Sequence, residues 1–246
     1  MLQVDDLSKR YGETVALDGV GISFSPGTVH TILGENGSGK STLVKLLSGI
    51  VLPDRGRISF DGKPVGGRIP AHFQAAGFAT VFQEVLIAPD RNVVDNILLG
   101  YDGIVTRRVP RHERWALAGK VLAEFAVTPV PLDRLAGELP LATQQLVVLA
   151  RALVREPRVL ILDEVTAALD LADRESVFAL MRRRAEAGCL IVFITHRMDE
   201  VMAMSDRVSV LRSGRLVQTL ERHELEPQRL LALTAPETAK ELQGGH

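Results

Sequence analysis

The chain has 246 residues, 46% of them hydrophobic, which is enough to bury a full core. Its formal net charge of −1 provides no basic surface over the whole chain, so we expect no nucleic acid among its partners. The single cysteine, Cys189, lies in an apolar run, so intrachain disulfides are excluded and a reducing compartment is expected.

Residues 1–84 are typical of short strands, such as residues 21–25 and 57–61, separated by Gly- and Pro-containing turns. Residues 29–33 form a β-branched, apolar run that predicts a buried strand, and residues 42–47 have helical spacing. Between them, residues 34–41 are GENGSGKS and fill every fixed position of the phosphate-binding loop Gly-x-x-x-x-Gly-Lys-Ser/Thr. A chance match within a rigid turn is the alternative, but the order strand, loop, helix argues against it.

This loop predicts a nucleoside triphosphate as ligand, together with Mg²⁺. Its glycines let backbone N–H groups turn toward phosphate oxygens, and the amino end of the following helix adds partial positive charge. Lys40 would reach the β- and γ-phosphates, and Ser41 would supply an oxygen to Mg²⁺. The predicted nucleotide-binding residues of the loop are Gly34, Glu35, Asn36, Gly37, Ser38, Gly39, Lys40, Ser41 and Thr42.

The strand-like run of residues 77–82 ends at Gln83, whose amide we expect to contact Mg²⁺ or an attacking water. Residues from about 85 to 156 then become helical, with helices predicted at residues 90–99, 111–126 and 141–155. A basic cluster lies in this region, for which a solvated face is the first interpretation and contact with a membrane partner or anionic headgroups the second. Its members are Arg107, Arg108, Arg111, His112 and Arg114.

Residues 157–220 return to alternating strands and helices, which indicates parallel βαβ units. The run RVLILDE ends in two carboxylates: Asp163 would orient Mg²⁺, and Glu164 would polarise a water against the γ-phosphate. Taken alone, this run also fits a buried strand that ends in an acidic surface turn. A third apolar strand, residues 189–195, would place His196 near the same phosphate, although a lone strand-end histidine is ordinarily structural.

Together these motifs resemble the nucleotide-binding subunit of ATP-binding cassette (ABC) transporters, over roughly residues 2–233. The resemblance implies an α/β fold, a P-loop NTPase of the ABC cassette type with a mixed sheet core, an antiparallel β subdomain and an inserted helical subdomain. It implies ATP and Mg²⁺ as cofactors. In the family's terms Lys40 belongs to the Walker A loop, Gln83 to the Q-loop, Asp163 and the catalytic Glu164 to Walker B, and His196 is the switch histidine.

Two further segments take their interpretation from the resemblance. Residues 167–170 are similar to the D-loop, which crosses to the partner subunit, and Tyr11 lies where the family places an aromatic ring that stacks on adenine. A surface tyrosine in a hairpin is the alternative for Tyr11.

The chain departs from the family at the Leu-Ser-Gly-Gly-Gln signature, where residues 139–145 are LPLATQQ. Pro140 replaces the serine whose hydroxyl and N–H would hold a γ-phosphate, and Leu141 and Ala142 replace glycines. Val165 replaces the proline that usually follows the catalytic glutamate. We therefore expect an intact phosphate-binding half and an altered signature.

Several segments are similar to the first of two cassettes in importers of simple sugars of the ribose and galactose type, so an ATP-hydrolysing subunit of a sugar importer is the expected function. Importers of another small solute such as an amino acid, soluble ABC ATPases outside transport, and P-loop kinases are the alternatives. The expected partners are transmembrane permease subunits, a second ATP-binding cassette in a heterodimer, and indirectly an extracytoplasmic solute-binding protein. A homodimer is the alternative to the heterodimer.

The sequence also gives expectations for location and domains. No apolar stretch approaches the roughly 18–20 residues that span a bilayer, and residues 1–12 lack a secretory signal. We therefore expect a peripheral protein at the cytoplasmic face of the cell membrane. One domain is expected at residues 1–235, with a helical subdomain at about 85–156 and a polar tail at 236–246.

Overall fold

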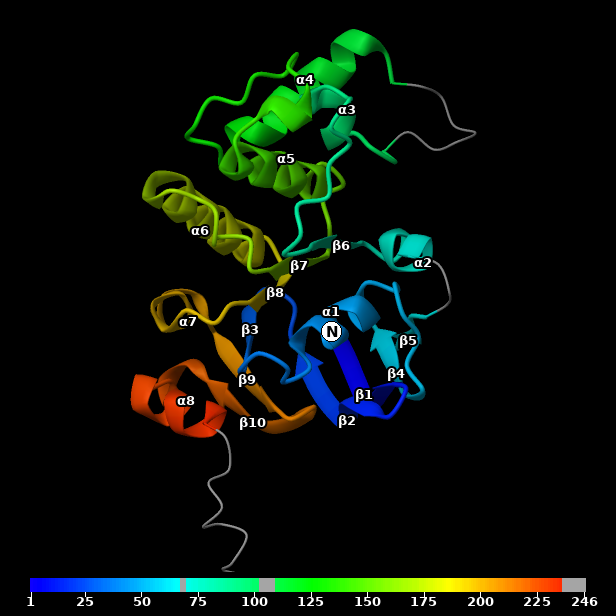
Figure 1. Cartoon of the computed structure of the whole chain (residues 1–246), viewed down its shortest axis with the longest axis vertical. Coiled ribbons are helices and arrows are strands. Elements are labelled where there is room, and N and C mark those ends of the chain that lie inside the picture. Colours follow the sequence, from blue (N-terminus) through cyan, green and yellow to red (C-terminus); the bar gives the residue numbers. More distant parts are fainter. Residues whose placement is uncertain (67–69, 102–108, 236–246) are drawn as a thin grey trace, which may run out of the picture. The chain divides into compact units, whose positions relative to one another are not determined.

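The computed structural model describes residues 1–66, 70–101 and 109–235. The chain forms two compact units. Unit 1 comprises Met1–Ser25, His30–Pro70 and Ile194–His246, and unit 2 comprises Pro26–Val29 and Ala71–Phe193. Figure 1 shows the elements in sequence colours.

Unit 1 contains an antiparallel sheet whose strands follow the order β2-β1-β4-β5. The strands are β1 (Leu2–Tyr11), β2 (Thr14–Phe24), β4 (Arg55–Phe60) and β5 (Lys63–Pro64). Leu2 pairs with Phe24 and Val4 with Ile22, and all four side chains are buried. The alternation of apolar and polar residues therefore buries one face of this sheet, as expected for a period of two.

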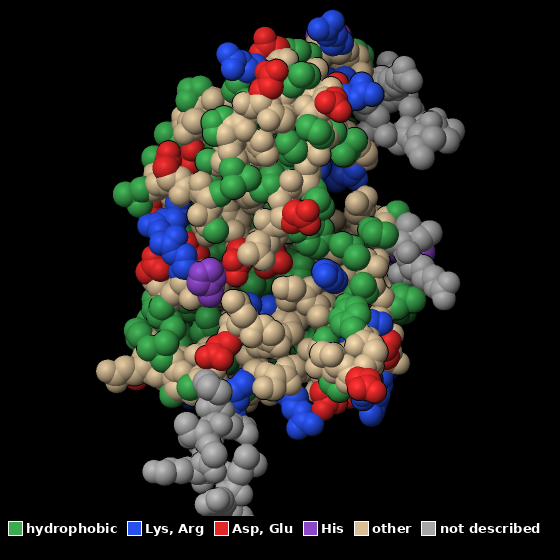
Figure 2. Space-filling model, in the orientation of Figure 1, with side chains coloured by type: hydrophobic (Ala, Val, Ile, Leu, Met, Phe, Trp, Pro, Cys, Tyr) green, Lys and Arg blue, Asp and Glu red, His purple; other side chains and the backbone are tan. Residues whose placement is uncertain are grey.

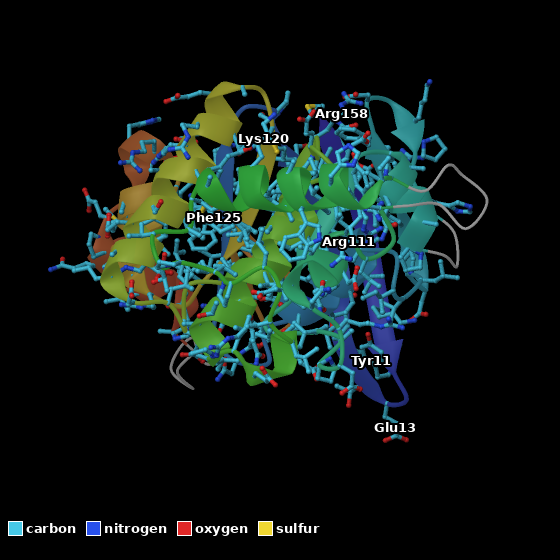
Figure 3. All side chains as sticks on the ribbon, turned by 90° about the horizontal axis from the view of Figure 1, so that it is seen from above. Tyr11, Glu13, Arg111, Lys120, Phe125 and Arg158 are labelled. Carbon is cyan, nitrogen blue, oxygen red and sulfur yellow. The ribbon has the colours of Figure 1, made fainter. Side chains whose placement is uncertain are left out.

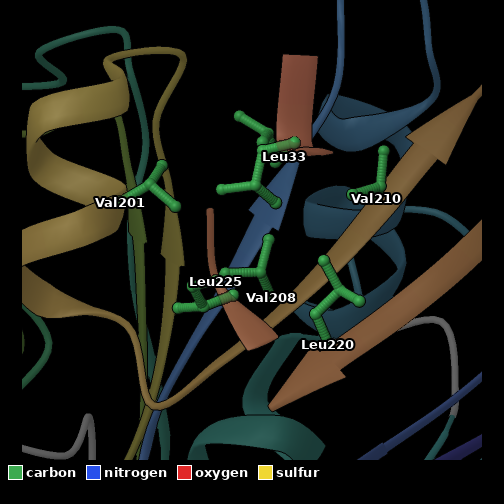
Figure 4. Close-up of a cluster of buried hydrophobic side chains, with 7 residues drawn as sticks. Leu33, Val201, Val208, Val210, Leu220 and Leu225 are labelled. Carbon is green, nitrogen blue, oxygen red and sulfur yellow. The ribbon is translucent and has the colours of Figure 1, made fainter. Parts of the chain in front are cut away.

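Unit 1 also carries the strands that support the glycine loop. β3 (Val29–Leu33) runs parallel to β9 (Arg207–Arg212), and β9 pairs antiparallel with β10 (Arg215–Glu221). The helices here are α1 (Lys40–Leu47), α7 (Met198–Met204) and α8 (Pro227–Thr234). One buried cluster joins these strands to α7 and α8, and its members are Leu33, Val201, Val208, Val210, Leu220, Leu225 and Leu230. Figure 4 shows these side chains as sticks, with all but Leu230 labelled.

Unit 2 contains the strands in the order β8-β7-β6, namely β6 (Phe78–Val81), β7 (Val159–Asp163) and most of β8 (Leu190–Ile194). β6 and β7 are parallel. Both β7 and β8 are buried along their whole length, because helices cover parallel sheets on both faces. α6 (Leu171–Glu186) packs on this sheet through an edge-to-face contact between Phe178 and Phe193.

The rest of unit 2 is helical, as predicted for residues 85–156. α3 (Val93–Ile97), α4 (Arg111–Ala123) and α5 (Leu141–Leu153) pack against one another, with a 3₁₀ turn at Ala136–Glu138 before α5. A short helix, α2 (Pro70–Ala75), precedes β6. The mixed sheet, the antiparallel sheet and the helical insertion confirm the predicted fold class.

Several predicted boundaries were wrong. The helix predicted at residues 90–99 is only α3, because the Asn92 side chain accepts a hydrogen bond from the N–H of Asp95 and begins the helix there. The single helix predicted near residues 222–233 is a 3₁₀ turn, Arg222–Glu224, followed by α8, because Glu221 and Glu224 form a capping box and Pro227 starts a new helix.

Other elements differ mainly in length. The helices predicted at residues 111–126 and 141–155 end at Ala123 and Leu153, and the strand predicted at 21–25 begins at Thr14. The helix α2 was not predicted. The polar tail at residues 236–246 lies outside the described residues.

The surface carries both signs of charge. Figure 2 shows acidic and basic side chains interspersed on the visible face, in agreement with a net charge near zero. Across the described residues, no helix is both long enough and apolar enough to cross a bilayer.

Candidate functional site

The glycine-rich loop of unit 1 is curled around the ammonium group of its own lysine. Lys40 Nζ donates to the carbonyl oxygens of Gly34 at 2.7 Å and Glu35 at 2.9 Å, and the lysine is only 7% exposed. The N–H of Ser38 donates to the Glu35 carbonyl at 3.1 Å and tightens the turn. These contacts shape the loop around a positive charge at its centre.

Three glycines shape this loop for different reasons. A Cβ on Gly34 would lie 2.3 Å from the Leu211 carbonyl oxygen, and one on Gly39 would lie 2.6 Å from the Ala16 carbonyl oxygen. Both glycines therefore permit close packing of the loop against the protein. Gly37 has a φ of 82°, and a Cβ at this position would have no atom within 4 Å. Glycine is therefore needed here for the left-handed backbone conformation and not for lack of space.

A β-turn between β9 and β10 supports the loop from behind. Gly214 donates its N–H to the Ser38 carbonyl at 3.0 Å, and its own carbonyl accepts from Asp18. Ser213 and Gly214 have positive φ values of 49° and 77°, as a type I′ hairpin turn requires. We did not predict this support from the sequence, although the Ser-Gly pair between two strands was a usable turn signal.

A small cavity of about 100 Å³ lies between the loop and this turn. Its wall includes Ser38, Ser213 and Thr234. The Ser38 Oγ is buried and has no hydrogen-bond partner among the described residues. The Ser38 hydroxyl is available for a hydrogen bond, and there is open space beside Gly37. Both features suit a loop that forms further hydrogen bonds when a phosphate binds.

His196 follows β8 and is exposed in unit 1. The residues on either side of it are held in place: Thr195 donates its hydroxyl to Glu200 Oε2 at 2.6 Å and accepts from the N–H of Arg197 at 3.1 Å. Glu200 is buried, and Arg197 lies 3.6 Å from its other oxygen. These contacts of Thr195 and Glu200 beside His196 were not predicted, because a threonine and a glutamate five positions apart carry no distinctive sequence pattern.

In unit 2, two predicted site residues meet at the ends of neighbouring strands. Gln83 lies two residues beyond β6, and its Nε2 donates to Oε2 of Glu164, one residue beyond β7, at 3.2 Å. Asp163 is the last residue of β7 and is buried. Glu164 has a φ of 50°, a left-handed backbone conformation that is uncommon and costs energy for a residue other than glycine.

The structure distributes the predicted site residues over both units. Lys40, Ser41 and His196 belong to unit 1, whereas Gln83, Asp163 and Glu164 belong to unit 2. Lys40 and Ser41 begin α1, whereas Gln83, Asp163, Glu164 and His196 lie at or just beyond the carboxyl ends of strands, where ligands bind in α/β sheets.

The altered signature forms the start of α5. Pro140 is the N-cap residue, and within the described chain no side chain caps this helix end. The Gln144 side chain donates to the Leu139 carbonyl at 2.8 Å, and Leu141 is 59% exposed. This end of α5 presents an apolar side chain where the family has small and hydroxyl-bearing residues.

Asp170, in the segment similar to the D-loop, has a local structural role. Its side chain accepts from the N–H of Asp173 at 2.8 Å and caps α6. Asp173 in turn accepts from the N–H groups of Val127 at 2.8 Å and Thr128 at 3.1 Å. The Asp170 cap thus fixes the start of α6, and Asp173 joins this helix to the segment after α4.

Tyr11 lies at the end of β1, beside the turn to β2, and is 45% exposed. Figure 3 shows it with Glu13 at this end of the hairpin. The ammonium group of Lys9 lies 5.7 Å from the ring centroid, within cation–π range. The ring is accessible for stacking, and its role stays a prediction.

The basic cluster is only partly described. Arg107 and Arg108 lie outside the described residues, and Arg111 and His112 are exposed at the start of α4. Arg114 instead donates to Asp95 at 3.0 Å and is largely buried. The interpretation of a solvated face does not extend to Arg114, whose side chain is 22% exposed and joins α4 to α3.

Comparisons with known proteins show which family this chain is similar to. A family model described as "ABC transporter" matches residues 17–167, more than half of the chain. The protein named "Ribose import ATP-binding protein RbsA 1" from Rhizobium johnstonii is 39% identical over 219 residues, covering 89% of this chain and 43% of that protein. The protein of the same name from Streptomyces avermitilis is 42% identical over 217 residues, covering 88% of this chain and 41% of that protein.

The chain thus spans less than half the length of these curated relatives. Among solved structures, a nucleotide-free ATP-binding cassette from an ABC transporter has a TM-score of 0.82 at 27% identity, covering 99% of this chain and 97% of that chain. The ADP conformation of another such cassette has a TM-score of 0.79 at 28% identity, with 94% of each chain covered.

Proposed function

Because this chain belongs to the ABC transporter family, we propose that it binds ATP and hydrolyses it to drive the import of a small solute. The observation that carries the proposal is the loop closed around Lys40 Nζ, with both of its carbonyl contacts inside the loop. A γ-phosphate would offer the ammonium group a charged hydrogen-bond acceptor at this loop, and hydrogen bonds between charged groups are stronger than those to neutral carbonyls.

We propose a role in the chemistry for each predicted site residue. Lys40 and the loop N–H groups bind the phosphates, and Tyr11 stacks on the adenine. Glu164 polarises a water for attack on the γ-phosphate, Gln83 orients that water, and His196 contacts the same phosphate. The loop residues that contact the nucleotide are Gly34, Glu35, Asn36, Gly37, Ser38, Gly39, Ser41 and Thr42.

Ser41, Gln83 and Asp163 would hold Mg²⁺. A hydroxyl, an amide oxygen and a carboxylate form the hard oxygen set that Mg²⁺ prefers, and the nucleotide phosphates complete such sites. When bound, the ion neutralises charge on the phosphates.

We propose a simple sugar as the solute, because the relatives described above carry the name of ribose import proteins. The proposed partners are transmembrane permease subunits and a second ATP-binding cassette, with an extracytoplasmic solute-binding protein acting through the permease. The exposed Leu141 and the proline N-cap of α5 favour a partner cassette different from this chain, because two copies would each present this altered signature. This assembly lies at the cytoplasmic face of the membrane.

Two measurements test the proposal. Isothermal titration with ATP and Mg²⁺ should show binding to the chain by itself, and Lys40→Ala should reduce it. In proteoliposomes that hold the permease, the partner cassette and the binding protein, ribose or a related sugar should stimulate ATP hydrolysis. If an amino acid but no sugar stimulates ATP hydrolysis, the transported solute is not a sugar. If the chain does not bind ATP, the proposal is refuted.

A further inference from the structure

A fully buried amide organises the segment that follows Gln83 in unit 2. Asn96 is 0% exposed, and its Oδ1 accepts from the N–H of Ala88 at 2.8 Å. Its Nδ2 donates to the carbonyls of Ala88 at 2.9 Å, Arg91 at 3.2 Å and Asn92 at 3.1 Å. One side chain therefore closes residues 88–92 into a fixed loop, although they form no strand.

Arg151 of α5 joins this loop to the helix that begins at the altered signature. Its Nε donates to the Asn96 carbonyl at 2.7 Å, and its Nη2 donates to Asn96 Oδ1 at 3.1 Å. Its Nη1 donates to the Leu86 carbonyl at 2.7 Å. All three acceptors are neutral oxygens, and the planar fork of an arginine fits two adjacent acceptors in a way that lysine cannot.

The position of these contacts along the chain gives them their meaning. Leu86 lies three residues after Gln83, whose amide contacts Glu164, and Arg151 lies on the same helix as Leu141. The short backbone segment from Gln83 to Leu86 is therefore hydrogen-bonded to Glu164 at one end and to Arg151 of α5 at the other, all inside unit 2. Residues 84–87 have neither helix nor strand to hold them, so the Arg151 contact to Leu86 fixes their end.

We propose that Arg151, together with Asn96, is a positioning residue that holds Gln83 against Glu164 and makes α5 and residues 83–92 move as one body. For ATP hydrolysis, this inference rests on the proposed function. The altered signature at the start of α5 and the water-orienting amide would then change position together. Arg151 does not contact the nucleotide in this proposal, and its effect passes through Gln83.

The test compares Arg151→Met and Arg151→Lys with the wild type in two assays. In amide hydrogen exchange on the isolated chain, Arg151→Met should accelerate exchange at residues 86–92 by about tenfold or more, and Arg151→Lys by less, because lysine reaches one acceptor at most. In the assembled transporter, the kcat for ATP hydrolysis should fall by about tenfold while the KM for ATP stays within about twofold, since Arg151 is outside the phosphate loop.

Arg155→Met is the matched control. Arg155 follows α5 and donates to the Gly100 carbonyl, so this variant also removes an arginine–carbonyl contact in unit 2 but spares the Gln83 segment. It should leave exchange at residues 86–92 and the kcat unchanged. If Arg151→Met does not fold, Arg151→Lys decides in the same two assays.

The outcomes separate the two ideas. Unchanged exchange at residues 86–92 in the folded Arg151 variants would overturn the inference, and so would faster exchange with an unchanged kcat. A wild-type transporter without ATPase activity would refute the proposed function. The exchange assay needs no nucleotide and tests the contacts of Arg151 with Leu86 and Asn96 separately.

Discussion

The side chain of Gln83 donates a hydrogen bond to Glu164 at 3.2 Å, joining the ends of the parallel strands β6 and β7. The hydrogen bond holds the Glu164 carboxylate, and the backbone of Glu164 has a φ of 50°, which is uncommon for a residue other than glycine. Such fixation is what a general base requires, because proton transfer depends on position before it depends on pKa.

Glu164→Gln should abolish most ATP hydrolysis and keep ATP binding. The glutamine amide oxygen can still accept from Gln83, so the position is preserved while the basic carboxylate is lost. We expect kcat in the assembled transporter to fall by about 10²–10⁴-fold. Lys40→Ala should instead weaken ATP binding, measured by titration calorimetry. Hydrolysis by Glu164→Gln near the wild-type rate would show that another group is the base.

Tyr11→Ala should weaken ATP affinity by about 1–3 kcal/mol, the range for a base stacked on an aromatic ring. Tyr11→Trp should retain affinity, because it keeps an aromatic face at the hairpin end. Val15→Ala is the control, since Val15 is also exposed and pairs with Arg10 in the same hairpin. Equal ATP affinities for wild type and Tyr11→Ala would show that Tyr11 is a surface residue of the hairpin and does not stack on adenine.

The triple substitution Pro140→Ser, Leu141→Gly and Ala142→Gly should raise ATPase activity of the isolated chain. Serine can cap α5 and donate to a phosphate, and the glycines allow close backbone approach. The wild-type chain alone should bind ATP, remain mostly monomeric by light scattering and hydrolyse slowly. Strong, cooperative hydrolysis by the wild-type chain alone would contradict the need for a different partner cassette.

His30 should make the chain less stable below about pH 6.5. Burial, and to a smaller extent the nearby Arg207, lowers the pKa of this histidine to about 3. Its Nε2 is within hydrogen-bonding distance of Ser209 Oγ at 2.8 Å. As the pH falls, His30 takes up a proton in the unfolded chain near pH 6.5 but in the folded chain only near pH 3. The free energy of unfolding is therefore unaffected by this histidine above pH 6.5 and decreases as the pH drops from 6.5 toward 3.

The loss at pH 4 should be about 3 kcal/mol in the free energy of unfolding, on the scale of 1.4 kcal/mol per pKa unit. Urea unfolding between pH 4 and 8 measures it, with His30→Gln as the comparison because glutamine does not titrate. The variant should show a smaller change across this range, which separates His30 from the carboxylates. Identical pH dependences would contradict the assignment.

The sequence by itself determined those features that depend only on residues close together along the chain. The glycine loop before α1, the buried strand ending at Asp163 and the helical stretch before it all follow from the spacing of apolar, glycine and charged residues. Helix ends were less predictable: Asn92 and the Glu221–Glu224 box begin new turns within what apolar periodicity alone suggests is continuous helix.

Only the tertiary structure decided which distant residues meet. Gly34 must be small because the Leu211 carbonyl lies against it, and that carbonyl is contributed by β9. Arg151 resembles an ordinary surface arginine on a helix, but it lies against Asn96, 55 positions earlier. A pattern of nearby residues cannot report such contacts, because they depend on how strands and helices pack after the chain has folded.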